Sequence, residues 1–277
     1  MLAEGLDHPE GICRTPHGRL FVGGEAGQIY EIDEAGSFTE LLSVGGFVLG
    51  LAADGDGRVY AIDSSARCVW RVDPDALTHE LWLSSPTGPR QFHTPNWGAF
   101  DRHGNYYLSD SGDWGGRNGC LWRVPAGSRE AELWSEDAAA FPNGLALAAG
   151  DSVLYVLESY PGAIVELEIR DDGSAGERRL LCDLDPIVPD GIALAEDGAL
   201  YVACYRPDAV YRWQTDDGLT LVAADPRGTV LAAPTNIASA GRDAIVVPNL
   251  AGWHLTRIPI GVALVEPSYP TRAQLGG

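Results

Sequence analysis

The feature that most constrains this chain is a segment that recurs along almost its whole length. Each copy contains a short apolar run, a tight turn with Gly or Asp, and a second run rich in β-branched and aromatic residues, which is the pattern of a β-hairpin. The six copies are HPEGICRTPHGRLFV, VLGLAADGDGRVYAI, TPNWGAFDRHGNYYLS, FPNGLALAAGDSVLYVL, VPDGIALAEDGALYVA and APTNIASAGRDAIVVP. Their later prolines are 47 residues (95 to 142), 47 residues (142 to 189) and 45 residues (189 to 234) apart. A fixed period of this length indicates a repeat architecture.

Two further strands complete the repeating unit. A third apolar run with polar alternation follows each hairpin, at residues 27–33, 67–73, 119–125, 162–168, 208–214 and 253–259. A fourth run, such as FTELLS or AELWSE, follows in several units. Four short antiparallel strands repeated every 40–50 residues are typical of a propeller blade. We therefore predict an all-β, six-bladed β-propeller with four-stranded antiparallel blades, formed by residues 1–277 as a single domain. The alternative, a large β-sandwich, does not repeat at a fixed long period.

One column of tyrosines in the second strands is expected to pack between blades, because buried aromatic side chains dominate such interiors. The column contains Tyr60, Tyr107, Tyr155 and Tyr201.

The charge balance narrows the range of partners. Against 19 basic residues the chain has 39 acidic ones, for a formal net charge of −20, which opposes binding to nucleic acid or to an anionic membrane surface. A cation or a neutral small molecule fits this charge better. The N-terminus lacks a signal-peptide pattern and no long apolar stretch follows, so we expect a soluble, cytoplasmic protein. Five cysteines without a C-x-x-C pair predict reduced, mostly buried thiols.

Polar residues recur at one place in the first run of each repeat. In a propeller these runs line the central channel, so residues at equivalent places surround a common axis. The position is occupied by Glu10, Leu49, Asn96, Asn143, Asp190 and Thr235. Taken singly, an Asn or Asp before Gly commonly caps a turn. Four oxygen-bearing side chains in register favour a different interpretation.

Two carboxylates and two amides form the ligand type that a hard dication requires, and Ca²⁺ takes six to eight oxygen ligands. We therefore predict one divalent metal ion, Ca²⁺, bound by Glu10, Asn96, Asn143 and Asp190. Mg²⁺, Mn²⁺ and Zn²⁺ are the alternatives. Four protein ligands leave coordination positions for water or for a substrate oxygen.

At these residues the chain resembles the regucalcin/gluconolactonase (SMP-30/gluconolactonase/LRE-like) family of six-bladed propellers, and more distantly diisopropyl fluorophosphatase and the paraoxonases. The best matches are PNGLAL, PDGIAL and the YYLSD…GCLWRV pair. The resemblance implies a divalent metal, typically Ca²⁺, in the channel. It places the family glutamate on Glu10, the mid-ring asparagine on Asn143 and the aspartate on Asp190, while the further asparagine of the more distant relatives falls on Asn96. Leu49 and Thr235 offer little to a second ion.

The resemblance also implies a small-molecule substrate, because many relatives hydrolyse lactones or organophosphorus esters. The leading hypothesis is a metal-dependent hydrolase of a lactone or related ester, in which the ion polarises the carbonyl and Asp190 acts as general base or nucleophile. A non-hydrolytic enzyme, such as a cyclase or lyase of specialised metabolism, is one alternative. A calcium- or metabolite-binding propeller without turnover is another, and an interaction scaffold is a third.

Several further residues are candidates for substrate binding. His8 and His93 precede channel positions and could move protons near neutral pH, although ordinary turn histidines occur in such places. The third repeat carries a Gly-rich insert at 111–119, which is expected to shape the mouth of the channel. Trp97, Asp110, Trp114 and Arg117 could form a specificity wall there, with Arg117 as an anchor for an anionic group. For Trp97, core packing between blades is an equal alternative.

Overall fold

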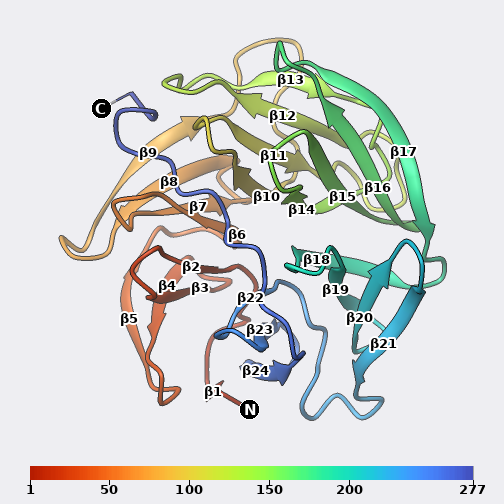
Figure 1. The fold of residues 1–277 in the computed structure, drawn as a ribbon. Helices are drawn as coiled ribbons and strands as arrows, with labels where there is room; N and C mark the ends of the chain where they lie inside the picture. Colours follow the sequence, from red (N-terminus) through yellow and green to blue (C-terminus); the bar gives the residue numbers. More distant parts are fainter. Residues whose placement is uncertain (277) are drawn as a thin grey trace.

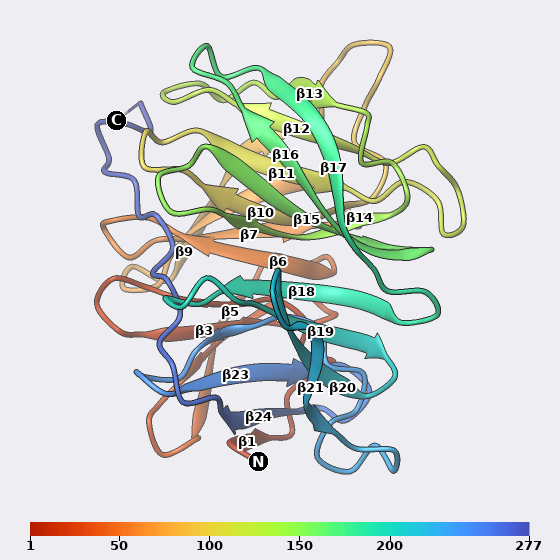
Figure 2. The ribbon, with the colours of Figure 1, turned by 45° about the vertical axis from the view of Figure 1, so that its right-hand side comes forward.

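The computed structural model describes residues 1–276 and confirms the predicted all-β propeller. Six four-stranded antiparallel sheets are arranged as blades around a central channel (Figures 1 and 2). Within the described residues, no helix is long and apolar enough to cross a membrane.

The blades follow the order of the repeats. Blade 1 contains β2 (Ile12–Arg14), β3 (Leu20–Gly23), β4 (Gln28–Ile32) and β5 (Phe38–Ser43). Blade 2 contains β6 (Val48–Ala53), β7 (Val59–Asp63), β8 (Cys68–Asp73) and β9 (Thr78–Ser84). Blade 3 contains β10 (Pro95–Phe100), β11 (Tyr106–Asp110), β12 (Cys120–Val124) and β13 (Glu132–Ser135). Blade 4 contains β14 (Pro142–Leu147), β15 (Val153–Ser159), β16 (Gly162–Ile169) and β17 (Ala175–Asp183). Blade 5 contains β18 (Val188–Leu194), β19 (Leu200–Arg206), β20 (Ala209–Gln214) and β21 (Gly218–Ala224).

The N-terminus closes the ring. Blade 6 takes β22 (Ala238–Ser239), β23 (Ala244–Asn249) and β24 (His254–Pro259) from the C-terminal part of the chain. Its outer strand is β1 (Ala3–Glu4), which pairs antiparallel with β24 in the register Ala3↔Leu255. Backbone hydrogen bonds between the two ends of the chain therefore hold the first and last blades together.

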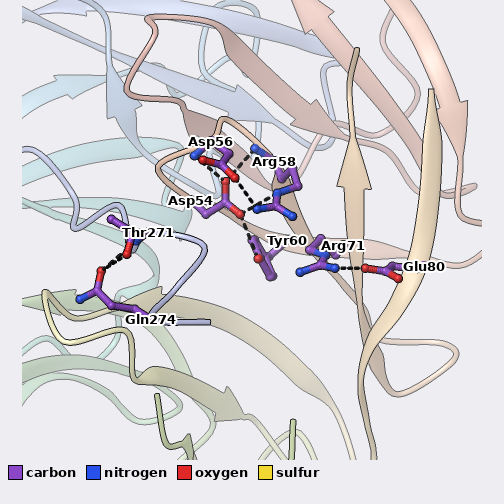
Figure 3. A network of polar contacts seen from close by, with 8 residues as sticks. All are labelled: Asp54, Asp56, Arg58, Tyr60, Arg71, Glu80, Thr271 and Gln274. Atoms are coloured by element: carbon purple, nitrogen blue, oxygen red, sulfur yellow. Dashed lines mark hydrogen bonds and ion pairs between the residues drawn. The ribbon is translucent and has the colours of Figure 1, made fainter. Parts of the chain in front are cut away.

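The turns between first and second strands form as the D-G pattern predicts. In blade 2, Asp54 Oδ1 accepts hydrogen bonds from the backbone N–H groups of Asp56 and Arg58, each at 3.0 Å. Tyr60 donates its hydroxyl to Asp54 Oδ2 at 3.0 Å, and Figure 3 shows this network with Arg71 and Glu80 beyond it. Side-chain oxygens thus satisfy backbone groups that a turn leaves unpaired.

The core lies between neighbouring blades, and the tyrosine column packs there as predicted. Tyr60 and Tyr107 are fully buried, Tyr201 is 3% exposed, and Tyr155 is half-buried against blade 5. The Tyr60 ring is 4.8 Å from Trp82 and 4.9 Å from Phe100 of the next blade, both edge to face. All five cysteines are free thiols, and four of them are buried.

Candidate metal centre

The first strands direct the predicted ligands towards the axis because each strand is irregular at that point. The pairing of first and second strands shifts between Pro95 and Gly98 in blade 3 and between Pro142 and Leu145 in blade 4. A similar shift follows Pro189 in blade 5. A bulge of this kind takes a residue out of the ladder and redirects its side chain. Asn96, Asn143 and Asp190 occupy these irregular positions.

Glycines next to the ligands let the first strands approach one another closely. A Cβ on Gly144 would lie 2.6 Å from the carbonyl oxygen of Asp190, and one on Gly191 would lie 2.2 Å from that of Thr235. Only glycine fits at such an approach. The P-N-G and P-D-G sequences therefore combine one oxygen ligand with the close packing that brings it near the axis.

All four predicted ligands are buried and share one unusual property. Glu10, Asn96, Asn143 and Asp190 are between 4% and 8% exposed. Each has a buried oxygen without a hydrogen-bond partner: Glu10 Oε2, Asn96 Oδ1, Asn143 Oδ1 and Asp190 Oδ1. An unpartnered buried polar atom is costly and needs an explanation. Here four such atoms, all acceptors, come from four blades.

Two serines fix the orientation of the two amides. Ser159 donates its hydroxyl proton to the carbonyl of Pro189 at 2.7 Å and accepts from Asn143 Nδ2 at 3.4 Å. Ser111 donates to the carbonyl of Pro142 at 2.8 Å and accepts from Asn96 Nδ2 at 3.1 Å. A hydroxyl whose one proton is donated to a carbonyl can only accept a second hydrogen bond, so it must face the amide nitrogen. The amide oxygens are consequently the atoms left without a partner.

The two carboxylates are in an environment that resists their joint ionisation. Burial raises the pKa of Glu10 well above its usual value, and the negative charge of Asp190 raises it further, whereas the Asn236 side chain lowers it. Burial also raises the pKa of Asp190 to about 7, with the Asn143 side chain acting in the opposite direction. A cation between the two groups would reverse both effects.

Polar side chains at the ends of the second strands have a structural role, because they accept hydrogen bonds from the backbone. Asp63, Asp110 and Asn249 end the second strands of three blades, and Glu158 is the last residue but one of β15. Asp110 accepts from the backbone N–H groups of His93 at 2.8 Å and Thr94 at 2.7 Å. Glu158 accepts from the N–H of Ala140 at 3.0 Å. The suggestion that Asp110 belongs to a specificity wall is therefore wrong, because its 2% exposed carboxylate holds the preceding loop.

Blade 6 differs from the pattern and contributes a residue that the repeat alignment did not identify. Thr235, in the aligned position, is fully buried and donates its hydroxyl to the backbone carbonyl of Glu10 at 3.0 Å. The next residue, Asn236, is 1% exposed, and its Nδ2 makes no hydrogen bond. It occupies the place of the glycine in P-N-G and P-D-G. This departure from the repeat is the sequence feature that indicates a special role for Asn236.

Three aromatic rings gather near the start of β14, the strand that carries Asn143. Trp114, on the insert of blade 3, is 56% exposed. Its ring lies 5.0 Å from Phe141 and 5.2 Å from Tyr160, between ring centroids. Phe141 is two residues before Asn143, and Tyr160 directly follows Ser159. The exposed aromatic surface therefore lies next in sequence to Asn143 and to the serine that orients it.

The other predicted substrate residues are divided between surface and core. His93 is exposed, with Nε2 at 3.3 Å from Asp113 Oδ1, and Arg117 is exposed on the insert. Trp97 is only 8% exposed and belongs to the hydrophobic cluster between blades 3 and 4. The Trp97 side chain thus packs between blades, and its role in substrate binding stays a prediction.

His8, two residues before Glu10, contacts two carboxylates. Its Nδ1 is 2.8 Å from both Asp7 Oδ1 and Glu25 Oε2, and its ring packs against Trp253 at 5.0 Å. Asp7, His8 and Glu25 could together offer three ligands to a metal, but they lie partly in solvent and contact one another directly. An imidazole that donates from Nδ1 to a carboxylate keeps a basic Nε2.

Comparisons with known proteins agree with this architecture. The family model described as SMP-30/Gluconolactonase/LRE-like region matches residues 9–244. A search of curated proteins finds no match. Among solved structures, a gluconolactonase from Xanthomonas campestris is similar with a TM-score of 0.79 and 20% identity, over 95% of this chain and 88% of that one.

Two other solved structures show how widely the fold is used. The calcium-binding protein regucalcin from Agrobacterium tumefaciens has a TM-score of 0.77 and 15% identity, over 98% of this chain and 96% of that one. Virginiamycin B lyase from Staphylococcus aureus has a TM-score of 0.65 and 19% identity, over 95% and 84% of the two chains. At these identities the likeness shows the fold alone. The match of the family model over most of the sequence goes further: this chain belongs to the SMP-30/gluconolactonase/LRE-like family.

Proposed function

We propose that the protein is a divalent-metal-dependent hydrolase of a lactone or related ester, with Ca²⁺ held in the central channel by Glu10, Asn96, Asn143 and Asp190. The observation that carries the proposal is the set of four buried, unpartnered oxygens. An all-oxygen set suits Ca²⁺ better than Zn²⁺, which prefers nitrogen and sulfur ligands. Family membership and a gluconolactonase among the similar folds support the reaction class.

The ion would polarise the substrate carbonyl as a Lewis acid. Asp190 is the residue that we assign to the chemistry, as general base towards water or as nucleophile. Its burial supports this role, because a carboxylate with a raised pKa is a stronger base. Coordination weakens that basicity, so the role requires one Asp190 oxygen to remain off the ion. His8 is the second group able to accept a proton, through Nε2.

The substrate would be bound by residues at the mouth. Trp114, Phe141 and Tyr160 offer an aromatic wall, and a ring or apolar substituent next to the lactone can pack against it. His93 and Arg117 offer polar contacts on the same blade and insert. We expect Trp114→Ala to raise KM for aryl-substituted lactones while kcat changes little, since such binding is similar in ground and transition states.

The test is hydrolysis of a panel of γ- and δ-lactones and aryl esters by the Ca²⁺-loaded protein. Glu10→Gln and Asp190→Asn are compared with the control Asp216→Asn. Asp216 is exposed and lies in the turn between β20 and β21. We expect Asp216→Asn to match the wild type and Asp190→Asn to lose activity at least a hundredfold. Unchanged activity in Asp190→Asn would remove that residue from its role.

The fold of virginiamycin B lyase is a reason to test elimination as well. Reaction in ¹⁸O-labelled water separates the two: hydrolysis incorporates the label into the acid product, whereas elimination does not. Ca²⁺ binding with no turnover of any substrate would instead favour a metal- or metabolite-binding propeller.

A further inference from the structure

A cavity of about 390 Å³ occupies the channel beyond the oxygen ring. The four proposed metal ligands do not line it. Its wall includes Trp97, which directly follows Asn96, and in the other five blades it begins two residues beyond the channel position, at Ile12, Leu51, Leu145, Ile192 and Ile237. The cavity, which we call the distal cavity, therefore lies further along the first strands than the candidate metal centre. Its volume is within the range of small-molecule sites, about 300–1,000 Å³.

The repeat itself keeps this space open. The third residue after the channel position is small in all six blades, and each of these residues lines the cavity: Cys13, Ala52, Ala99, Ala146, Ala193 and Ala238. Four of the alanines are only partly buried although they lie on the innermost strands. Protein interiors are normally filled to high density, so a channel narrowed by small side chains alone retains room for another molecule.

The C-terminal segment forms one wall of the distal cavity. After β24 the chain crosses the middle of the ring, as the blue trace in Figure 1 shows. Val265 donates its N–H to Leu194 at 2.8 Å, Tyr269 donates its hydroxyl to the carbonyl of Arg14 at 2.9 Å, and Gln274 Nε2 donates to the carbonyl of Arg102 at 2.7 Å. Figure 3 shows Thr271 and Gln274 beside the turn of blade 2. Exposed residues such as Gly150 and Glu266 lie at the edge, so the cavity opens to solvent beside this segment.

One cation is available inside the apolar wall. Arg14 is half-buried and lines the cavity. Its Nε donates to the carbonyl of Ser239 at 2.8 Å and its Nη1 to that of Gly18 at 2.6 Å. None of the ion pairs within residues 1–276 involves it, whereas the neighbouring Arg102 contacts Asp151 at 3.6 Å. A guanidinium has five N–H donors in a fork that matches a carboxylate, so Arg14 keeps donors for an anion.

We propose that the distal cavity is a second binding site, and that it takes a small carboxylate with an apolar body, whose chain contacts the alanine ring and whose head contacts Arg14. This site is independent of the proposed lactonase reaction. The two proposals can therefore fail separately.

Octanoate is the probe, and its binding to the full chain is measured by isothermal titration calorimetry with Ca²⁺ and again with EDTA. We expect saturable one-to-one binding that is the same in both conditions, because the carboxylate does not reach the metal centre. Hexanoate should bind roughly tenfold more weakly than octanoate, since two buried methylene groups are lost. Absence of saturable binding, or binding that requires Ca²⁺, would overturn the proposal.

Two variants test where the alkyl chain of octanoate binds, and two test the contact of its head group. Ala146→Leu and Ala193→Leu fill the cavity and should each weaken octanoate binding at least tenfold, while Ala126→Leu, at an exposed turn, should leave it unchanged. Arg14→Gln should weaken octanoate binding about tenfold and leave octanol binding unchanged, and Arg14→Lys should restore part of the loss. Melting temperature and Ca²⁺ titration of each variant show that the fold and the metal centre persist. Octanoate binding that survives both leucine variants, or octanol binding as tight as octanoate binding, would contradict the assignment.

Discussion

Burial raises the pKa of Glu10, and the negative charge of Asp190 raises it further, although the two residues are 180 positions apart in sequence (10 to 190) and belong to different blades. Sixfold repetition explains the encounter, because every first strand begins at the same end of the channel. Such a pair is unfavourable on its own, and each additional unpartnered oxygen adds to the cost. A bound dication would turn the same arrangement into a stabilising one.

Ca²⁺ is expected to stabilise the metal-free protein against unfolding. A ligand that binds only the folded state at 100 times its Kd contributes about 2.7 kcal/mol to the free energy of unfolding. For a chain of this size the melting temperature should then rise by roughly 5 °C or more. Differential scanning calorimetry after EDTA treatment, with Ca²⁺ restored stepwise, measures the shift.

Glu10→Gln provides the control for this measurement. It removes one charge and one strong ligand, so the shift produced by Ca²⁺ should largely disappear while the metal-free variant becomes more stable than the metal-free wild type. A wild-type protein that gains no stability from Ca²⁺, Mg²⁺, Mn²⁺ or Zn²⁺ would contradict the metal centre.

The stability of the metal-free protein should depend on pH through Asp190. Its pKa is raised from 3.8 to about 7 in the folded state, so its protonated form is favoured by folding. The corresponding stability is fully present below about pH 4 and is lost as the pH rises through about 7. Glu10, whose pKa is also raised, acts in the same direction. Other carboxylates act oppositely, including Asp7 and Asp197, whose pKa values are lowered.

Comparison with Asp190→Asn isolates the effect. With EDTA present, the melting temperature of the wild type minus that of Asp190→Asn should decrease between pH 4 and pH 7. It should then level off. A difference that does not vary with pH would show that Asp190 ionises in the folded protein as it does in the unfolded chain.

Ser159 is predicted to act on metal affinity without contacting the ion. Its hydroxyl accepts from Asn143 Nδ2 and donates to the carbonyl of Pro189, which fixes the orientation of the amide. Loss of such a supporting contact typically costs 10- to 100-fold in metal affinity. We expect Ser159→Ala to weaken Ca²⁺ binding at least tenfold in a calorimetric titration. Ser111→Ala should do the same through Asn96.

Ser135 offers a matched control, since it is a buried serine at the end of an outer strand. Ser135→Ala should leave Ca²⁺ affinity unchanged. Equal losses in all three variants would point to general destabilisation instead of amide orientation.

The sequence was sufficient for the blades and for the channel position, because both depend on periodicity. The hairpins, the third strands and the tyrosine column were predicted from short-range patterns, and the structure confirms them. The burial of Glu10, Asn96, Asn143 and Asp190 at one channel also follows from register alone. These predictions needed no knowledge of how distant segments pack.

Other features depend on tertiary contacts that a repeat does not encode. The pairing of β1 with β24 and the passage of the C-terminal segment across the channel break the period, so the repeat does not predict them. Ser111 and Ser159 act through hydrogen bonds to the next blade. Trp97 was ambiguous because an aromatic residue after a channel position suits both a wall and a core. Asn236 stood one place outside the aligned column.

Asn236 is predicted to support the ionised form of Glu10. Its side chain is close enough to lower the pKa of Glu10, although its Nδ2 forms no complete hydrogen bond. Replacement by leucine should raise the pKa of Glu10, so that protons compete more strongly with the metal. We expect Asn236→Leu to weaken Ca²⁺ binding by up to about tenfold, with a larger loss at pH 6 than at pH 8. Asn236→Asp, which adds a third carboxylate, should instead destabilise the metal-free protein and gain more stability from Ca²⁺ than the wild type does. Ca²⁺ titrations at both pH values measure these affinities. An Asn236→Leu variant that binds the ion as tightly as the wild type would contradict this role.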